Sequence, residues 1–196
     1  MNVGIFGGTF DPPHAGHLIV AQDAALALGL DRILFVPAAR PPHKRDAAVS
    51  DAKTRAAMLE LAVHGDDRFG IDTLELDRPG ASYTVDTVRE LAGRDTNIRW
   101  TLLIGADQYS EFDTWREPDA IRRLARVAVL MRHGGHGSEL SEGDVALDVT
   151  RIDISATIVR ERVAAGLPIR YLVPRAVEEF IFERKLYLRN GTPVTG

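Results

Sequence analysis

Two histidines near the start of the chain have the types and spacing of a phosphate-binding pair. They stand at His14 and His17 in the segment GGTFDPPHAGH, residues 7–17. Side chains three residues apart point the same way on a helical turn, and the first turn of a helix presents free backbone N–H groups that favour an anion. Gly7 and Gly8 allow a ligand close to the backbone. The segment is therefore predicted to bind phosphate, although two histidines on a surface turn could also be purely structural.

A second segment near the other end of the chain also offers donors to phosphate. In ISATIVR, residues 154–160, Ser155 is predicted to cap a helix whose first N–H groups stay free. Arg160 lies about one turn further on and carries a planar fork of donors. Taken alone, this pattern also fits an ordinary capped helix with a solvated arginine.

A basic loop, PAARPPHK at residues 37–44, supplies Arg40, His43 and Lys44. A loop in this place would lie beside a bound nucleotide, or it could simply be solvated. Lys44 is a better candidate than Arg40 for contacting phosphate. Arg45 could share that role, because the sequence does not rank it against Lys44.

The segments that must position these residues alternate between short apolar strands and longer amphipathic helices. Such alternation predicts an α/β fold, a Rossmann-like doubly wound parallel sheet with helices on both faces and a small C-terminal helical part. Gly29 is expected to end the first helix and Ser50 to cap the second. The strands are predicted at 2–6, 32–36, 69–76, 98–104, 126–131 and 145–152, and the helices at 17–28, 51–64, 84–91, 119–124, 156–165 and 175–183.

The placement of the candidate site follows from this architecture. Ligands of such sheets bind beyond the carboxyl ends of the strands. The polar turns that follow predicted strands are therefore expected to carry the chemistry, and they come after Phe6, Val36, Ile104 and Ile152.

Length and composition set further bounds. A chain of 196 residues with 45% hydrophobic side chains suits one domain, expected at 1–189, with a C-terminal tail at 190–196. The absence of cysteine excludes a disulfide framework, a thiolate zinc site and a cysteine nucleophile. A net charge of −4 argues against a nucleic-acid partner. The chain shows no signal peptide and no apolar run near the ~20 residues that cross a bilayer, which predicts a soluble, cytoplasmic protein without a membrane partner.

The first histidine segment carries a resemblance to a known superfamily. The pattern T-F-D-P-x-H-x-G-H, here at residues 9–17, resembles the signature of nucleotidyltransferases related to class I aminoacyl-tRNA synthetases. The resemblance implies that both histidines contact ATP phosphates and that the segment at 154–160 closes over the β- and γ-phosphates. The ATP site that it implies comprises Gly7, Gly8, Thr9, Phe10, His14, His17, Gly105, Asp107, Ile154, Ser155, Thr157 and Arg160.

Three further segments resemble the bacterial nicotinate mononucleotide adenylyltransferase family, over residues 2–188. They are PPHK at 41–44, SYTVDTV at 82–88 and IGADQYSEFDTW at 104–115 with Ile121 after it. The resemblance implies a site for the acceptor nucleotide, nicotinate mononucleotide, at Thr9, Lys44, Tyr83, Thr84 and Trp115.

The chemistry of the acceptor agrees with that implied site. A flat nicotinate ring can stack on Trp115, and the hydroxyl of Thr84 can donate to its carboxylate. In the family that the sequence resembles, the position matched by Asp107 contacts the adenosine or ribose side of the nucleotide. Each of the three also has an ordinary interpretation, because Trp115 could pack in the core and Thr84 and Asp107 could cap helices.

The reaction that the resemblance implies is ATP plus nicotinate mononucleotide giving nicotinate adenine dinucleotide plus pyrophosphate. The acceptor phosphate attacks the α-phosphorus in line, and positioning and charge neutralisation dominate. The catalytic residues are expected to be His14, His17, Lys44 and Arg160. Mg²⁺ would enter with ATP, since no cluster of protein carboxylates suggests a metal site.

Three alternatives stay open at this point. The acceptor could instead be nicotinamide mononucleotide or phosphopantetheine, or the protein could be a nucleotide-binding sensor without turnover. Members of the family are often dimers, so a homodimer is also an open option.

Overall fold

The computed structural model of the chain describes residues 1–39, 50–78, 80–132 and 140–188. Its strands are β1 (Asn2–Gly8), β2 (Arg32–Pro37), β3 (Phe69–Ile71), β4 (Arg99–Gly105), β5 (Arg126–Arg132) and β6 (Val145–Val149). Its helices are α1 (Ala15–Leu28), α2 (Ala52–Val63), α3 (Thr84–Arg94), α4 (Ala106–Tyr109), the 3₁₀ turn η1 (Phe112–Thr114), α5 (Pro118–Leu124), α6 (Ala156–Ala164) and α7 (Arg175–Glu183).

The six strands form one parallel sheet in the order β3-β2-β1-β4-β5-β6. The chain builds outward from β1 to one edge and then returns to build outward from β4 to the other. The direction of strand order therefore reverses between β1 and β4, which is where open α/β sheets bind ligands. This arrangement confirms the predicted doubly wound fold.

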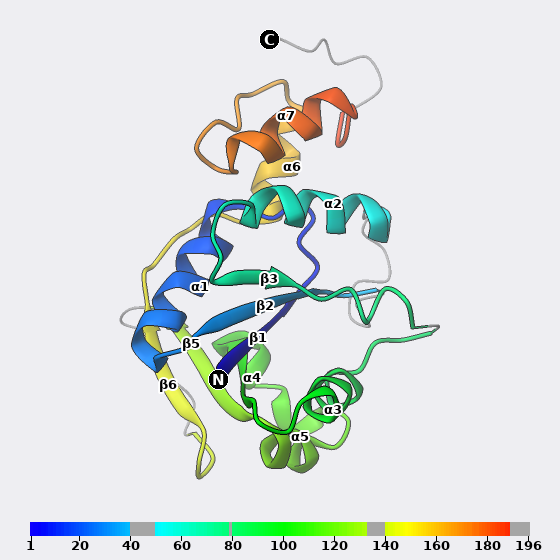
Figure 1. Cartoon of the computed structure of the whole chain (residues 1–196). Coiled ribbons are helices and arrows are strands. Elements are labelled where there is room, and N and C mark those ends of the chain that lie inside the picture. Colours follow the sequence, from blue (N-terminus) through cyan, green and yellow to red (C-terminus); the bar gives the residue numbers. More distant parts are fainter. Residues whose placement is uncertain (40–49, 79, 133–139, 189–196) are drawn as a thin grey trace.

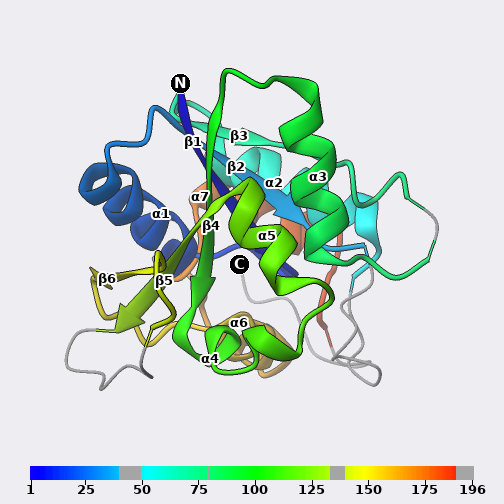
Figure 2. The same ribbon diagram turned by 90° about the horizontal axis from the view of Figure 1, so that it is seen from below.

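Helices cover both faces of the sheet (Figure 1). Successive strand residues point to opposite faces, so Leu102 and Ile104 of β4 pack with α3, α4 and α5, whereas Leu103 packs with α1 and α2. Figure 2 shows α3 and α5 together on one side of the strands and α2 on the other. Because both faces are covered, the inner parts of β1, β2, β4 and β5 are mostly apolar, as the sequence pattern predicted, whereas the edge strand β6 alternates between buried and exposed residues.

A third apolar core joins the C-terminal helices to the rest of the molecule. Met58 and Ala62 of α2 pack against Val159 of α6 and against Val177 and Ile181 of α7. Figure 1 shows α6 and α7 stacked beyond α2, away from the sheet. The predicted small C-terminal helical part is thereby confirmed, with α7 at the predicted residues. None of the described helices is long and apolar enough to cross a membrane.

The cap of α2 differs from the prediction. Asp51, not Ser50, is the N-cap, and its carboxylate accepts hydrogen bonds from the backbone N–H of Thr54 at 2.9 Å and from its hydroxyl at 2.7 Å. The hydroxyl of Ser50 donates instead to Tyr187 Oη at 3.2 Å. Ser50 therefore bonds to a residue far away in the sequence, although its local sequence position predicted a helix cap.

Two strands are shorter than predicted because side-chain contacts redirect the chain. β3 ends at Ile71, and the buried Glu75 that follows accepts a hydrogen bond from Thr87 Oγ1 at 2.6 Å. β6 ends at Val149, where the N–H of Thr150 donates to the carboxylate of Asp23 at 2.7 Å.

The end of α1 gives a test of the fold with a matched control. Gly29 adopts a φ of +58°, and a Cβ added there would meet nothing within 4 Å, so Gly29→Ala adds backbone strain alone. We expect Gly29→Ala to lower the free energy of unfolding by about 1 kcal/mol. Gly93→Ala, in the exposed last turn of α3, should raise it by about 0.5 kcal/mol. Urea denaturation measures both, and shifts of the same sign would contradict the assigned backbone.

Candidate active site

The carboxyl ends of β1 and β4 lie side by side and position the first predicted segment. The two strands pair up to Phe6 and Leu103, so the turns after Gly8 and Gly105 leave the sheet next to each other. Gly7 is exposed, and a Cβ there would meet nothing within 4 Å, which leaves room for a ligand. At Gly8 a side chain is disfavoured for a different reason, because an added Cβ would lie 2.8 Å from the ring of Phe10.

The two histidines open α1 and stack on each other. The imidazole centroids of His14 and His17 are 3.7 Å apart with an interplanar angle of 24°. Phe10 packs edge-on against His17 at 5.0 Å between centroids. A Cβ on Gly16 would approach His14 Nδ1 to 3.1 Å, so the glycine makes room for that ring. The prediction that the two side chains point the same way is confirmed.

Burial makes both imidazoles neutral at pH 7 in the unliganded protein. It lowers the pKa of His14 to about 4. Burial, and secondarily the charge of His14, holds the pKa of His17 well below its usual value. His17 Nδ1 accepts a hydrogen bond from the backbone N–H of His14 at 3.2 Å, so the neutral ring carries its hydrogen on Nε2. His14 Nδ1 is buried and has no hydrogen-bond partner among the described residues.

The expectation of free N–H groups at the start of α1 was wrong in part. The N–H of Ala15 donates to the carbonyl of Leu172 at 2.8 Å, and the N–H of His17 donates to the carbonyl of His14 at 3.0 Å. The connection between α6 and α7 thus covers part of this helix end. Two of the backbone donors that the sequence predicted to be free are therefore already occupied.

The two predicted phosphate segments meet in space. Arg160 Nη1 donates to the carbonyl of Asp11 at 2.7 Å, and its Nη2 donates to Thr157 Oγ1 at 3.2 Å. Ser155 caps α6 as predicted, because its Oγ accepts from the N–H of Ile158 at 3.2 Å. Ile154 is half-buried and packs on the C-terminal core. Residues from opposite ends of the chain therefore form one surface.

Asp107 lies at the same edge of the sheet, at the carboxyl end of β4. Its side chain is exposed and reaches back over Gly105, where a Cβ would lie 2.5 Å from Asp107 Oδ1. The N-cap of α4 is Gly105, so the alternative in which Asp107 caps this helix is excluded. The Asp107 carboxylate thus occupies the space beside Gly105 that a side chain there would enter.

Three of the residues predicted for the acceptor, Tyr83, Thr84 and Trp115, lie on two neighbouring turns, whereas Thr9 follows β1. Tyr83 is the exposed N-cap residue of α3, and Thr84 is its first helical residue, so Thr84 is not the cap. Trp115 is half-buried and packs on Phe112 at 5.1 Å between centroids. The guanidinium of Arg116 lies 5.0 Å from the centroid of Tyr83, which brings the turn at Trp115 against the start of α3.

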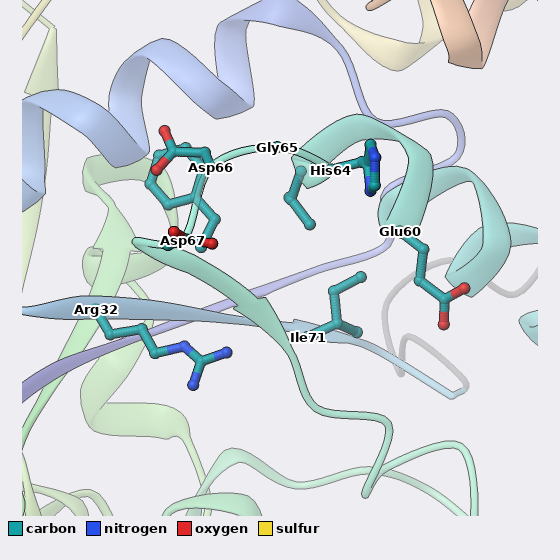
Figure 3. A pocket seen from close by; sticks show the side chains of 9 residues that line it. Arg32, Glu60, His64, Gly65, Asp66, Asp67 and Ile71 are labelled. Atoms are coloured by element: carbon teal, nitrogen blue, oxygen red, sulfur yellow. The ribbon is translucent and has the colours of Figure 1, made fainter.

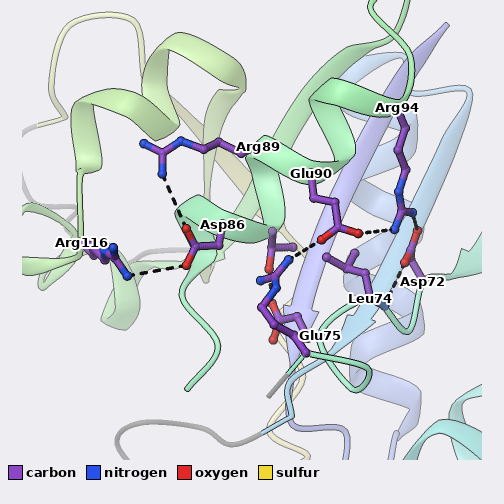
Figure 4. A network of polar contacts seen from close by, with 10 residues as sticks. Asp72, Leu74, Glu75, Asp86, Arg89, Glu90, Arg94 and Arg116 are labelled. Carbon is purple, nitrogen blue, oxygen red and sulfur yellow. Dashed lines mark hydrogen bonds and ion pairs between the residues drawn. The ribbon is translucent and has the colours of Figure 1, made fainter. Parts of the chain in front are cut away.

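Ion pairs hold these two turns together. Asp86 of α3 lies between Arg89 and Arg116, at 3.6 Å and 3.7 Å (Figure 4). Arg89 also pairs with Glu117, in the turn that follows Trp115. The turn at Trp115 and the start of α3 are therefore joined by exposed ion pairs as well as by the contact between Arg116 and Tyr83.

The candidates of the basic loop, Arg40, His43, Lys44 and Arg45, lie outside the described residues. Both described flanks of that loop converge on one residue that sequence reasoning missed. Arg55 of α2 is buried, with 1% of its surface exposed. Its guanidinium donates to the carbonyls of Ala38 at 2.7 Å, Ser50 at 3.1 Å and Thr9 at 2.8 Å.

A signal for Arg55 was present in the sequence. It stands four residues before Leu59 and eight before Val63, on the face of α2 that is otherwise apolar. A cation in that register has to find partners inside the protein. The pattern indicates burial, but it does not say which carbonyls are bound.

A pocket of about 340 Å³ lies elsewhere, between α2 and the amino ends of β2 and β3 (Figure 3). Charged side chains of both signs line it, and Asp66 there is engaged by Arg68. It contains none of the predicted site residues. The site described above lies at the carboxyl ends of the strands, and this pocket is separate from it.

Comparison with known proteins agrees with the fold and the motifs. The model of the family described as cytidylyltransferase-like matches residues 5–162. A protein of Thermus thermophilus named probable nicotinate-nucleotide adenylyltransferase is 45% identical over 95% of this chain and 100% of its own. One of the same name from Shouchella clausii is 43% identical over 96% of this chain and 98% of its own.

A solved structure of similar shape extends the comparison at lower identity. It is the Plasmodium falciparum nicotinic acid mononucleotide adenylyltransferase complexed with NaAD, with a TM-score of 0.76 and 16% identity, over 95% of this chain and 97% of that one. At that identity the likeness concerns the fold. The match to the family model and the near-full-length relatives decide the family: this chain belongs to the nicotinate-nucleotide adenylyltransferase family of cytidylyltransferase-like proteins.

Proposed function

We propose that the chain transfers AMP from ATP to nicotinate mononucleotide, giving nicotinate adenine dinucleotide and pyrophosphate. The names of the near-full-length relatives support this reaction. The observation that carries it is the meeting of Arg160 with Asp11, three residues before the His14–His17 pair. This contact gathers neutral and cationic donors beside the switch point of the sheet, where a nucleotide triphosphate would bind.

The proposed chemistry needs positioning and charge stabilisation more than proton transfer. The acceptor phosphate is already ionised, and one of its oxygens attacks the α-phosphorus of ATP while pyrophosphate leaves. His17 presents a neutral ring with hydrogen on Nε2, which can donate to a phosphate oxygen. A phosphate nearby favours the protonated imidazole, so positive charge would enter the site together with ATP.

Arg160 and Lys44 are proposed to hold the departing pyrophosphate. Arg160 uses Nη1 and Nη2 on protein oxygens, and a guanidinium has five N–H donors, so donors remain for a phosphate. The proposed ATP site as a whole comprises Gly7, Gly8, Thr9, Phe10, His14, His17, Gly105, Asp107, Ile154, Ser155, Thr157 and Arg160.

The acceptor is proposed to bind between the turns that carry Tyr83, Thr84 and Trp115, with Thr9 and Lys44 toward its phosphate. Trp115 packs on Phe112 and is half-exposed, which leaves ring surface for a nicotinate to stack on. Thr84 does not cap its helix, so its hydroxyl can donate a hydrogen bond to the carboxylate of the nicotinate ring.

Magnesium is proposed to arrive with ATP, held by phosphate oxygens and water. Among the described residues, no group of three or more His, Asp or Glu could hold a metal ion. The Asp11 carboxylate near the histidines is already engaged by Ser50 and Tyr187. We also propose one domain at 1–189, since α2 packs on both the sheet and the C-terminal helices.

The reaction is tested by pyrophosphate release from ATP and magnesium with each candidate acceptor. We expect nicotinate mononucleotide to be used with a kcat/KM at least about tenfold above that of nicotinamide mononucleotide, because a carboxylate offers two charged acceptor oxygens, whereas the carboxamide offers one neutral acceptor and an NH₂ group that hydroxyl and N–H donors leave unpaired. Preference for nicotinamide mononucleotide or phosphopantetheine would change the acceptor. Folded protein that binds ATP and releases no pyrophosphate with any acceptor would favour the sensor.

The role of His17 is tested by His17→Asn. The amide oxygen of asparagine can still accept from the N–H of His14, whereas the donor at Nε2 is lost. We expect kcat to fall by about 100-fold, the usual effect of removing one donor to a transition-state oxygen. His64→Asn is the matched control, because His64 is exposed at the distant pocket. Equal kcat values for the two variants would remove His17 from the mechanism.

The neutral histidines also predict how stability depends on pH. The pKa of His14 is about 4 when folded and near 6.5 when unfolded, so the unfolded chain binds more protons between these values. Stability from this residue is present above pH 6.5 and is lost as pH falls toward 4. We expect His14 to lower the free energy of unfolding by about 2 kcal/mol from pH 7 to pH 5, and His17, whose pKa is also lowered, to add to the drop in the same direction.

Urea denaturation at the two pH values measures that drop. His14→Gln removes the titrating ring and should show a smaller difference between pH 7 and pH 5. If its difference matched that of the wild type, the low pKa assigned to His14 would be incorrect.

A further inference from the structure

We propose that Tyr187, in the C-terminal helical part, is a positioning residue for adenylyl transfer that acts through Asp11 of the histidine segment. The proposal rests on the proposed function, and it assigns a role to a residue outside both phosphate-binding motifs. Tyr187 would not touch the nucleotides. Its hydroxyl would fix the position of the segment that carries His14 and His17, which are proposed to contact the nucleotide.

The contacts form a closed, part-buried ring of three residues. Tyr187 Oη donates to Asp11 Oδ1 at 2.6 Å, and the backbone N–H of Ser50 donates to Asp11 Oδ2 at 3.1 Å. The hydroxyl of Ser50 donates to Tyr187 Oη at 3.2 Å and closes the ring. Asp11 is 2% exposed, so its carboxylate depends on these partners rather than on water.

This ring sits directly behind the proposed catalytic groups. The carbonyl of Asp11 accepts the hydrogen bond from Arg160, and His14 follows three residues later. A shift of the Asp11 side chain would therefore move the backbone on which Arg160 rests. Because Arg160 and the histidines are proposed to act on the same phosphates, Asp11 sets their mutual distance.

A buried positive charge supports the same carboxylate. The guanidinium of Arg55 donates to the carbonyl of Ser50, whose N–H donates to Asp11. It also donates to the carbonyl of Thr9, two residues before Asp11. Asp11 thus has a cation nearby on α2 and a direct hydrogen bond from a phenol of the C-terminal part, and losing either leaves a buried anion less compensated.

Packing and backbone conformation fix the position of Tyr187. Its ring packs with the apolar core shared by α2, α6 and α7, and its backbone has a φ of +62°, a region that non-glycine residues enter only when packing requires it. Burial, first, and the hydrogen bond to Asp11 raise the pKa of Tyr187, so the phenol remains a neutral donor at every working pH.

Tyr187→Phe removes the hydroxyl and keeps the ring. Since a misplacement of about 1 Å can reduce a rate by about 100-fold, we expect a partial shift to lower kcat by about tenfold. KM for ATP should stay within about twofold of the wild type, because the groups that bind ATP remain present.

The matched control is Tyr171→Phe. Tyr171 also lies in the C-terminal part and also has a positive φ, but its side chain is exposed. Pyrophosphate release is measured for the wild type and both variants, and calorimetric ATP titration counts the folded sites, so kcat is expressed per competent site. A residue with a merely structural role would change the number of sites and leave kcat per site unchanged.

A second measurement needs no turnover. The chain has six histidines, and the imidazole NMR signals of His14 and His17 can be assigned through their own substitutions. We expect Tyr187→Phe to shift both signals and Tyr171→Phe to leave them in place. If Tyr187→Phe does not fold, Ser50→Ala, which removes one side of the ring, should give the same shifts to a smaller extent.

The outcomes separate the two proposals. An active wild type with kcat per site lowered in Tyr187→Phe and normal in Tyr171→Phe supports the positioning role. An active wild type with equal kcat per site in all three proteins, and unshifted histidine signals, overturns it alone. A wild type that binds ATP and releases no pyrophosphate with nicotinate mononucleotide overturns the proposed function and this role with it.

Discussion

The buried guanidinium of Arg55 is the constraint on which the geometry of the site depends. Removing a charge from water is unfavourable unless the protein replaces the lost hydrogen bonds. Arg55 satisfies that requirement by binding main-chain carbonyls in three separate segments, at Thr9, at Ala38 and Ala39, and at Ser50. These segments are the histidine turn and both described flanks of the basic loop. One side chain therefore adds a shared cross-link to three segments that also contact each other, through the Ala38 N–H to the carbonyl of Gly8 and through the Ser50 N–H to Asp11.

The electrostatics of the site follow from the same close packing. His14 and His17 stack on each other, Phe10 packs edge-on against His17, and burial keeps both rings neutral. A phosphate nearby favours the protonated imidazole, so the site would gain positive charge only when the nucleotide is present. The cationic groups stand slightly apart, with Arg160 on the carbonyl of Asp11 and Arg55 on that of Thr9. The unliganded protein thus avoids two adjacent imidazolium charges in a buried place.

Much of the fold could be predicted because it depends on local patterns. Buried strands appear in the sequence as short apolar runs, and Gly29 marks the end of α1 because only a residue without Cβ enters its φ of +58° without strain. Predictions failed where a distant group competes for a side chain. Ser50 has the chemistry of a helix cap, yet it bonds Tyr187, 137 positions away, and Asp51 takes the cap. The strand that begins at Phe69 ends earlier than predicted because the chain after it turns so that Glu75 accepts a hydrogen bond from Thr87.

Which chemical groups are present, and in what order, could be established from the amino-acid sequence without any coordinates. This holds for the histidine pair, the Ser155–Arg160 segment and the candidate acceptor residues, since a motif is a property of neighbours along the chain. The folded molecule was needed to learn that the histidines are neutral, that Arg160 rests on Asp11, and that Arg55 and Tyr187 support the site. Burial and long-range hydrogen bonds arise only when separate segments pack, so no local pattern contains them.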